Sequence, residues 1–229
     1  MTFTVPPTRG EAAARQLRAE IVSGVLRPGE VIKDAEIASR LNLSITPVRE
    51  AIAQLVTEGL IEAVPNRVRR VAPVTRESAI EVIDVMGVLG GAALERALPA
   101  LTPDVLARMR AELDAMNAAL AGHDSAAATA TGSRFTLIMV HAAGNGELEA
   151  LWNLVIARAQ RLMMLTAASG FWPLWQSGYG ETLALLEAGD TAGALLRFGQ
   201  IFVTVKEHLA KGTADGVILG GQGDSTNPG

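Results

Sequence analysis

Residues 44–62 constrain this chain most, because they combine a helix start, a one-sided apolar face and a polar face that carries an arginine. Thr46 suits an N-cap, and Pro47 suits the first turn because its missing N–H would be unpaired there. We therefore predict an amphipathic helix that ends at Gly59, with Arg49 on its polar face. Its buried stripe follows the helical repeat and comprises Val48, Ala51, Ile52, Leu55 and Val56.

Two more helices are predicted ahead of this one. Residues 9–23 form the first, with Gly24 in the position of a C-terminal cap. Asp34 can cap a short second helix, and residues 42–44 make a tight turn into the third. Two short helices joined by such a turn form a helix-turn-helix, whose second member enters the major groove of DNA.

A basic segment follows these helices. Residues 60–64 and 69–72 are predicted as two strands joined at residues 65–68, and Arg67, Arg69 and Arg70 fall within four positions. Alone, this would be an ordinary solvated hairpin tip. Beside a helix-turn-helix, we expect it to lie near DNA phosphates or in the adjacent minor groove.

Charge divides the chain in the same way. The net charge is −4, but residues 1–76 carry 11 Lys/Arg and 8 Asp/Glu, whereas residues 77–229 carry 9 and 16. A basic part joined to an acidic one fits DNA contact at one end, although chance imbalance on two solvated surfaces gives the same numbers.

Composition also excludes several classes of protein. The chain has no cysteine, which excludes disulfides, thiolate metal sites and cysteine nucleophiles. It has no Gly-rich phosphate loop and no nucleophile–base pair at a familiar spacing, so we expect no enzyme. No uncharged apolar run approaches the roughly 20 residues of a membrane helix, and no signal peptide is recognisable. We expect a cytoplasmic protein with no membrane segment.

The first third of the chain resembles the winged helix-turn-helix of the GntR family of bacterial transcription regulators. The resemblance covers about residues 9–75 and rests on S-G-V-L-R-P-G-E-V-I, T-P-V-R-E-A and E-G-L-I, followed by P-N-R and V-A-P-V-T. It implies contacts to double-stranded operator DNA from Arg40, Ser44, Thr46, Pro47, Arg49, Asn66, Arg67 and Arg69. Ile45 stands where the family usually has an arginine, and Val68 where its wing usually has a glycine. We therefore expect an operator that differs from the common family sequence.

The rest of the chain reads as helical. Helices are predicted near residues 76–98, 103–121, 124–143, from residue 145 onward, and at 176–188 and 191–211. The expected protein is mainly α: a winged helix-turn-helix with a small β-hairpin wing at residues 1–75, and an antiparallel bundle of six to seven helices at residues 76–211. Residues 212–229, rich in Gly, Asp, Ser and Asn, are predicted to be disordered.

Two segments of this second part, F-T-L-I-M-V-H-A-A-G-N-G-E-L and L-L-E-A-G-D-T-A-G-A-L, resemble the FadR C-terminal (FCD) effector domain. The resemblance implies the FadR branch of the family. It further implies a homodimer on a palindromic operator, with DNA binding modulated by a small-molecule effector. Many such domains hold a metal through an Asp and three His, but the matching positions here are Gly132, Thr136, Tyr179 and Ile201. None of these can replace the expected ligand, so we expect no metal and no cofactor.

The expected effector is largely apolar, such as a fatty-acyl, aromatic or lactone compound. The Arg and Glu usual on the first helix of the domain are replaced by Met86 and Gly90, which argues against the small metal-bound organic acids that relatives sense. Predicted pocket residues are Met86, Arg134, Thr136, His141, Arg158, Arg161 and Tyr179. His141 on an apolar helix is more often a hydrogen-bonded core residue than a ligand, and Phe171, Trp172 and Trp175 fit core or dimer packing better than ligand stacking. A constitutive regulator that has lost its effector site remains the alternative.

Overall fold

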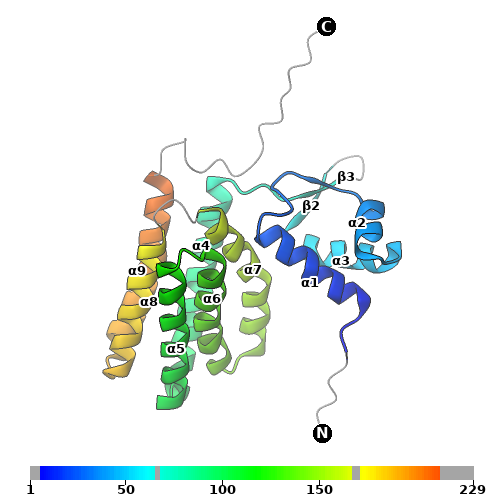
Figure 1. The fold of residues 1–229 in the computed structure, drawn as a ribbon. Coiled ribbons are helices and arrows are strands. Elements are labelled where there is room, and N and C mark those ends of the chain that lie inside the picture. The colour runs from blue at the N-terminus through cyan, green and yellow to red at the C-terminus, as the bar shows by residue number, and fades with distance from the viewer. Residues whose placement is uncertain (1–5, 65–67, 167–170, 212–229) are drawn as a thin grey trace. The chain divides into compact units, whose positions relative to one another are not determined.

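The protein divides into two compact units after Thr75 (Figure 1). The structure is a computed structural model, and it describes residues 6–64, 68–166 and 171–211. Each unit has its own core and is described by itself. The predicted disordered tail, residues 212–229, lies outside the described residues.

Three helices and a small sheet form the N-terminal unit (Figure 1). The helices are α1 (Arg9–Val22), α2 (Asp34–Leu41) and α3 (Ile45–Thr57). The strands β1 (Val31–Ile32), β2 (Ile61–Val64) and β3 (Val68–Val71) pair antiparallel in the order β1-β3-β2. Leu17 and Ile21 of α1 and Ile52 and Leu55 of α3 are fully buried, so the apolar stripes of the two helices form one core.

Several predicted helix ends need correction. Ser44, not Thr46, is the N-cap residue of α3, and Thr46 lies in the first turn. Lys33 is the N-cap residue of α2, so Asp34 is its first helical residue. Val56 is exposed, unlike the other four members of the predicted stripe. Gly59 has a φ of +69°, which glycine adopts without strain, and this confirms that the helix ends before it.

The wing is a three-stranded sheet and not only a hairpin. The sequence predicted β2 and β3 but missed β1, which has two residues and follows a turn. In β1, Val31 pairs with Arg70 and Ile32 with Arg69. This pairing places the residues just after β1, including Asp34, beside the wing.

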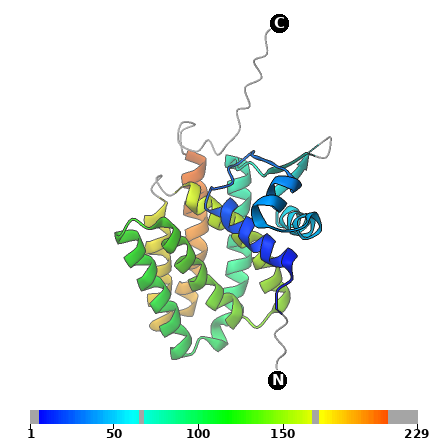
Figure 2. The ribbon, with the colours of Figure 1, turned by 45° about the vertical axis from the view of Figure 1, so that its right-hand side comes forward.

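Six α-helices and one 3-10 turn form the C-terminal unit within the described residues. They are α4 (Arg76–Ala97), η2 (Leu98–Ala100), α5 (Pro103–Ala121), α6 (Ser125–Ala142), α7 (Gly146–Leu165), α8 (Trp172–Glu187) and α9 (Thr191–Lys211). They lie side by side as a bundle, with α5 against α6 and α9 against both α4 and α8 (Figures 1 and 2). This confirms the predicted mainly helical fold.

Local capping explains most helix starts in the bundle. Thr102, Asp124 and Asn145 each accept a hydrogen bond from the backbone N–H three residues later, at or next to the predicted helix starts at residues 103, 124 and 145. The start of α8 is different: it begins at Trp172, four residues before the predicted position, with Pro173 in its first turn. Residues 167–170, just before this helix, lie outside the described residues.

Two glycines let α4 and α9 approach closely. A Cβ at Gly87 would lie 3.0 Å from the Cβ of Phe202, and one at Gly90 would lie 2.9 Å from Cε1 of Phe198. Phe198 and Phe202 continue into an aromatic cluster with Tyr179, Phe135 and Trp175. The core of the bundle is therefore aromatic where the family resemblance implied a polar metal site. Within the described ranges, no helix combines the length and apolar content needed to cross a bilayer.

Candidate nucleic-acid interface and effector cavity

The N-terminal half of α3 presents polar side chains on its outer side. Ser44, Thr46 and Arg49 are exposed, and Pro47 is half-buried in the first turn. The opposite face of the helix packs on α1 and α2, which fixes the direction of this exposed face. Ile45, where the family usually has an arginine, is also exposed and adds an apolar contact surface.

Asp34 connects three elements of this unit. Its Oδ1 accepts a hydrogen bond from Nη1 of Arg69 on β3 at 2.6 Å, and its Oδ2 accepts one from Nε of Arg49 on α3 at 3.0 Å. Burial alone would raise the pKa of Asp34, but the hydrogen bonds from the two arginines outweigh it and hold the pKa below its ordinary value. The carboxylate therefore stays ionised at neutral pH.

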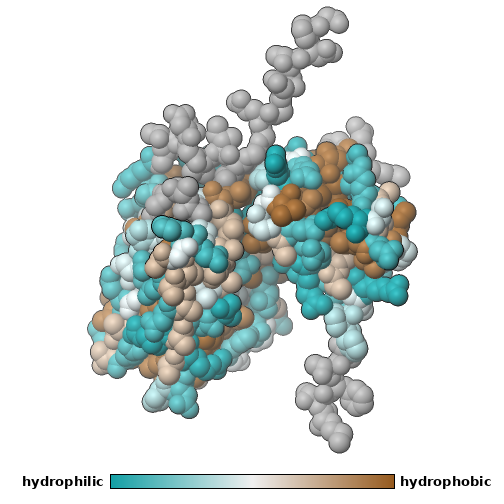
Figure 3. Space-filling model, in the orientation of Figure 1, coloured by the Kyte–Doolittle hydropathy of each residue, from teal (hydrophilic) through white to brown (hydrophobic). Residues whose placement is uncertain are grey.

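An open groove of about 600 Å³ runs between α3 and the sheet. Val31 and Val68 form its apolar part, and apolar residues gather over the strands in the space-filling view (Figure 3). Lys33, Arg49 and Arg69 supply three cations, against the carboxylate of Asp34 and that of Glu36, which pairs with Lys33. A groove with this excess of positive charge attracts the phosphates of a nucleic acid.

Arg40 has a structural partner. Its Nη1 and Nη2 both lie 2.6 Å from the carboxylate oxygens of Glu20, a residue of α1 that is only 8% exposed. This bidentate pair holds α2 against α1, and the hydrogen bond from Arg40 lowers the pKa of Glu20. DNA contact by Arg40 stays a prediction, and the geometry favours a structural role.

Replacing Arg40 with alanine is expected to lower the free energy of unfolding by about 1–3 kcal/mol at neutral pH, because Glu20 loses its cationic partner and keeps only the hydrogen bond from Gln16. This range is discounted for the partial exposure of Arg40. The folded-state pKa of Glu20 is depressed, so this stability is present above the ordinary carboxyl pKa of about 4.3 and is lost as the pH falls through the folded-state value. Urea unfolding of both proteins at neutral and acidic pH measures the difference. A variant that keeps wild-type stability but binds DNA less tightly would instead make Arg40 a DNA contact.

Two arginines of the wing have ion-pair partners. Arg69 pairs with Asp34, and Arg70 pairs with Glu62 across the β2–β3 ladder. Asn66 and Arg67, both predicted DNA contacts, lie outside the described residues.

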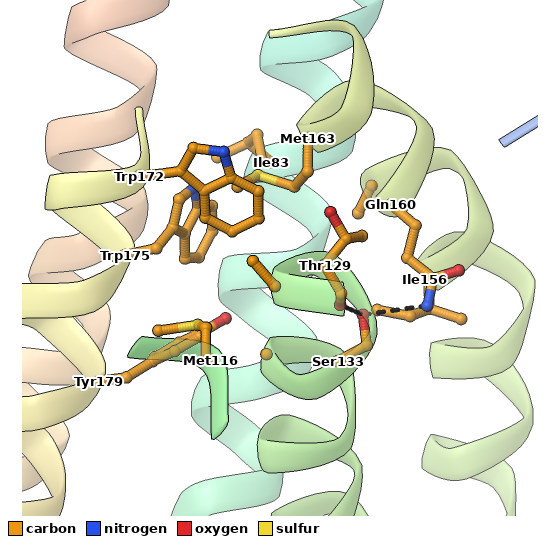
Figure 4. Close-up of a pocket in the computed structure, with 13 residues that line it drawn as sticks. Ile83, Met116, Thr129, Ser133, Ile156, Gln160, Met163, Trp172, Trp175 and Tyr179 are labelled. Carbon is orange, nitrogen blue, oxygen red and sulfur yellow. Dashed lines mark hydrogen bonds between the residues drawn. The ribbon is translucent and has the colours of Figure 1, made fainter. Parts of the chain in front are cut away.

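The C-terminal unit contains a cavity of about 50 Å³ (Figure 4). Trp172, Trp175 and Tyr179 of α8 lie on one side of it, and the Tyr179 hydroxyl points into the space. On the other side, Gln160 donates to Ser133 Oγ at 3.0 Å and Ser133 donates to the carbonyl of Thr129 at 2.7 Å. The remaining lining residues are Ile83, Met116, Ala128, Gly132, Ile156, Ala159 and Met163.

Three donors at this cavity lack an acceptor among the described residues. They are the indole Nε1 of Trp172, the indole Nε1 of Trp175 and the hydroxyl of Tyr179, for which the described residues supply no hydrogen bond. Burial raises the pKa of Tyr179, so its phenol stays protonated and can donate. Sequence analysis favoured packing for the two tryptophans and missed Ser133 and Gln160, which carry no motif.

Of the seven predicted pocket residues, only Tyr179 lines this cavity. Met86 and Thr136 are buried elsewhere, and the Thr136 hydroxyl donates to the carbonyl of Ser133 at 3.0 Å. Arg134 and His141 lie on the exposed side of α6, where they pair with Glu112 and Glu149. Both line a separate open depression of about 310 Å³ between α5 and α6, so their contact with an effector stays a prediction.

Two arginines of α7 have buried nitrogens without partners. Arg161 is 2% exposed, and its Nε and Nη2 find no hydrogen-bond acceptor among the described residues. The same holds for Nε of Arg158. Burial lowers the pKa of Arg161 to about 10. Neither residue lines the cavity, so their predicted contact with an effector is still a prediction.

The four positions that match the family's metal ligands do not fit a metal. Gly132 has no side chain, and the Thr136 hydroxyl is bonded to its own helix. A Cβ on Gly178 would lie 2.3 Å from Cγ1 of Ile201, so Ile201 fills this space with hydrocarbon. Tyr179 offers only a protonated phenol, and a divalent cation needs several carboxylate or imidazole donors at close range.

Comparison with known proteins decides the family. A model of the FCD domain matches residues 81–201, more than half of the chain, and a model of the bacterial regulatory proteins of the gntR family matches residues 9–71. A protein of Paenarthrobacter nicotinovorans, named a probable D-xylose utilization operon transcriptional repressor, is 30% identical over 173 residues, which cover 75% of each chain. The chain belongs to the GntR family of bacterial regulatory proteins. It is thus a GntR-family transcription regulator with an FCD effector domain, and not an enzyme.

Other similarities agree with this GntR-family fold. An uncharacterized HTH-type regulator of Agrobacterium vitis is 33% identical over 130 residues, covering 56% of this chain and 76% of its own. The structure of Escherichia coli McbR/YncC superposes with a TM-score of 0.75 at 24% identity, covering 90% of this chain and 98% of that one. A GntR regulator from Rhodococcus sp. RHA1 superposes with a TM-score of 0.76 at 22% identity, covering 89% and 98%. At these identities the two structures establish the fold alone.

Proposed function

We propose that this regulator acts in the cytoplasm as a homodimer, binds a palindromic operator through α3 and the wing, and releases or tightens that binding when a small molecule occupies the FCD domain. The FCD match supports placing it in the FadR branch of the family. The observation that carries the proposal is the exposed N-terminal half of α3 beside a cationic groove.

Base readout is assigned to Arg49. Its Nε donates to Asp34, while no described residue accepts a hydrogen bond from Nη1 or Nη2. Two parallel N–H donors match the O6 and N7 acceptors of guanine in the major groove. Ser44 and Thr46 add hydroxyl contacts to phosphates or bases, and Asn66 and Arg67 of the wing complete the predicted set.

The homodimer is supported by an apolar stripe on α4 and α9. On α4, Val88 is 68% exposed and Val85 is also exposed. On α9, Leu196 is 78% exposed and Val203 is also exposed. These helices pack against each other, which allows exposed side chains of both to contribute to one surface. A contiguous exposed apolar surface on a soluble domain marks an interaction site, and a two-fold axis would let it cover itself. Two copies of α3 would then read two half-sites.

The effector is proposed to be uncharged, largely apolar and equipped with one hydrogen-bond acceptor. The cavity is lined mainly by hydrocarbon and aromatic side chains, and its unpaired groups at Tyr179, Trp172 and Trp175 are donors. At about 50 Å³ the cavity holds only a few non-hydrogen atoms. A larger ligand requires Met116 and Met163 to move, and methionine is the side chain best suited to this because it is flexible.

The small cavity also supports the second candidate, a constitutive DNA-binding dimer that has lost effector binding. Ligand cavities in proteins usually measure about 300–1,000 Å³. A cavity far below that range, at positions without metal ligands, is what loss of the site would leave.

Matched probe compounds separate the two candidates. We expect acetophenone, which has a carbonyl acceptor, to raise the melting temperature and to shift the tryptophan fluorescence more than ethylbenzene does, and benzoate to do neither. Replacing Tyr179 with phenylalanine is expected to weaken acetophenone binding by about 2- to 12-fold, the equivalent of one hydrogen bond. Thr182→Val is the control, because it removes a buried hydroxyl of the same helix that donates to the carbonyl of Gly178. If neither acetophenone nor a wider set of neutral ligands raises the melting temperature, the constitutive dimer is the better account.

A further inference from the structure

Asp34 holds two arginines that come from different DNA-facing elements. Arg49 lies on the recognition helix α3 and Arg69 on the wing strand β3, and both donate to this one carboxylate. The Asp34 side chain is 19% exposed, whereas that of Arg49 is 65% exposed. The fixed partner is therefore the acid, and the arginine projects outward from it.

The backbone around Asp34 fixes where its carboxylate lies. Asp34 is the first residue of α2, where the helix dipole favours a carboxylate. It directly follows Ile32 and Lys33, and Ile32 is paired with Arg69 in the sheet. The backbone thus brings the carboxylate to Arg69 from one side, and the turn between α2 and α3 brings Arg49 from the other.

Holding Arg49 before DNA arrives reduces the cost of ordering it. A free arginine side chain loses rotamer entropy when it is ordered on binding. The bond from Nε to Asp34 fixes the plane of the guanidinium, while Nη1 and Nη2 remain available for a guanine. The same carboxylate opposes DNA phosphates, so it weakens binding that depends on charge alone.

Both effects act in the same direction on specificity, because one favours the correct base and the other disfavours DNA in general. We propose that Asp34 is a specificity-determining positioning residue, which orients Arg49 for base readout and couples the recognition helix to the wing through Arg69. The inference rests on the proposed function, since it requires that α3 reads DNA.

The chain offers a matched control in the same helical turn. Glu36 also carries a carboxylate at the start of α2, but it is 67% exposed and pairs with Lys33 at 2.7 Å. Within the described residues, Glu36 forms no ion pair with Arg49 or Arg69. Glu36→Gln therefore removes the same charge from the same place without disturbing the two arginines.

The test uses the full chain and a DNA duplex obtained by selecting a randomised library with the wild-type protein. Binding of wild type, Asp34→Asn and Glu36→Gln is then measured on that duplex, on single-base variants of it and on a scrambled duplex, at several salt concentrations. For Asp34→Asn we expect the ratio of specific to non-specific affinity to fall by about 10-fold or more, within the range of one lost arginine–guanine pair. For Glu36→Gln the ratio should stay close to wild type, although both variants should bind the scrambled duplex somewhat more tightly.

A second readout separates positioning from general damage. The single-base changes that weaken wild-type binding most should weaken the binding of Asp34→Asn much less. Base changes at the other positions should weaken the binding of both proteins equally. Asp34→Ser, which also suits a first helical turn, repeats the test if the asparagine variant does not fold. If wild type selects a clear sequence and Asp34→Asn behaves like Glu36→Gln, the inference about Asp34 is wrong and the proposed function stands. If wild type itself selects no sequence, the proposed function fails first.

Discussion

Replacing Arg49 with alanine is expected to lower affinity for the selected duplex by about 1–3 kcal/mol per half-site, or roughly 5- to 150-fold. The reason is the loss of both Nη donors of Arg49, which are free to bind a base because no described residue accepts a hydrogen bond from them. Affinity for scrambled DNA should fall far less, because the change removes a single charge from a groove that keeps Lys33 and Arg69. Fluorescence anisotropy with both duplexes measures the two effects.

Two companion variants make the Arg49 result specific. Arg49→Lys keeps the charge but cannot form the bidentate contact, so it should lose nearly as much sequence preference as alanine. Arg96→Ala removes an exposed arginine at the end of α4 and should bind both duplexes as wild type does. Equal losses on the selected and scrambled duplexes for Arg49→Ala would reduce this residue to a phosphate contact.

Replacing Val88 with aspartate is expected to convert the dimer into a monomer and to weaken operator binding by about 10²- to 10⁴-fold, because the second half-site is no longer linked to the first. Val88 is among the most exposed of the apolar side chains on α4 and α9. An aspartate there would be buried without a partner in a two-fold interface, which is costly. Sedimentation velocity measures the oligomeric state, and anisotropy measures the binding.

The control for this change is Ala115→Asp. Ala115 is exposed on α5, away from the apolar stripe, so the variant adds the same charge to another helical surface. It should remain a dimer and bind the operator as wild type does. A dimeric Val88→Asp protein with unchanged binding would place the dimer interface elsewhere.

The structural features that the sequence predicted best are those that local interactions determine. The spacing of Val48, Ala51, Ile52 and Leu55 predicted one buried face of α3, because a helix of 3.6 residues per turn places them together. The predicted helix starts at residues 103, 124 and 145 agree with the structure, in which Thr102, Asp124 and Asn145 each cap a helix by accepting a hydrogen bond from the backbone N–H three residues later. These interactions span one turn of chain and leave a visible pattern.

The missed features depend on contacts between distant residues. Asp34 was interpreted as a helix cap, whereas its carboxylate is used by Arg49 and Arg69, which are 15 and 35 residues away. Arg40 was assigned to DNA because the family resemblance suggested it, and only the fold shows that Glu20 of α1 lies within reach. A pairing of charges across elements has no sequence period, so charge alone could not reveal it.

The proposed effector site shows the same limit of sequence-based prediction. Alignment placed Tyr179 at a ligand position, and the structure places it on the cavity. Arg134 and His141 lie on the same helix as Gly132, which lines the cavity, but side chains a few positions apart on a helix face different directions. The amphipathic pattern of α6 is weak because both its faces are rich in small and apolar residues, so the inward face could not be chosen from sequence.

The central claim, that α3 and the wing of a symmetric dimer read a defined DNA sequence, is tested most directly by selection of a randomised duplex library with the wild-type chain, followed by affinity measurements from about 0.05 to 0.2 M salt. We predict a palindromic motif whose half-sites lie about one helical turn apart or a multiple of it, and a preference over scrambled DNA of about 10³-fold or more that persists as salt rises. Enrichment of no motif, with binding that weakens equally on all duplexes as salt increases, would contradict the account.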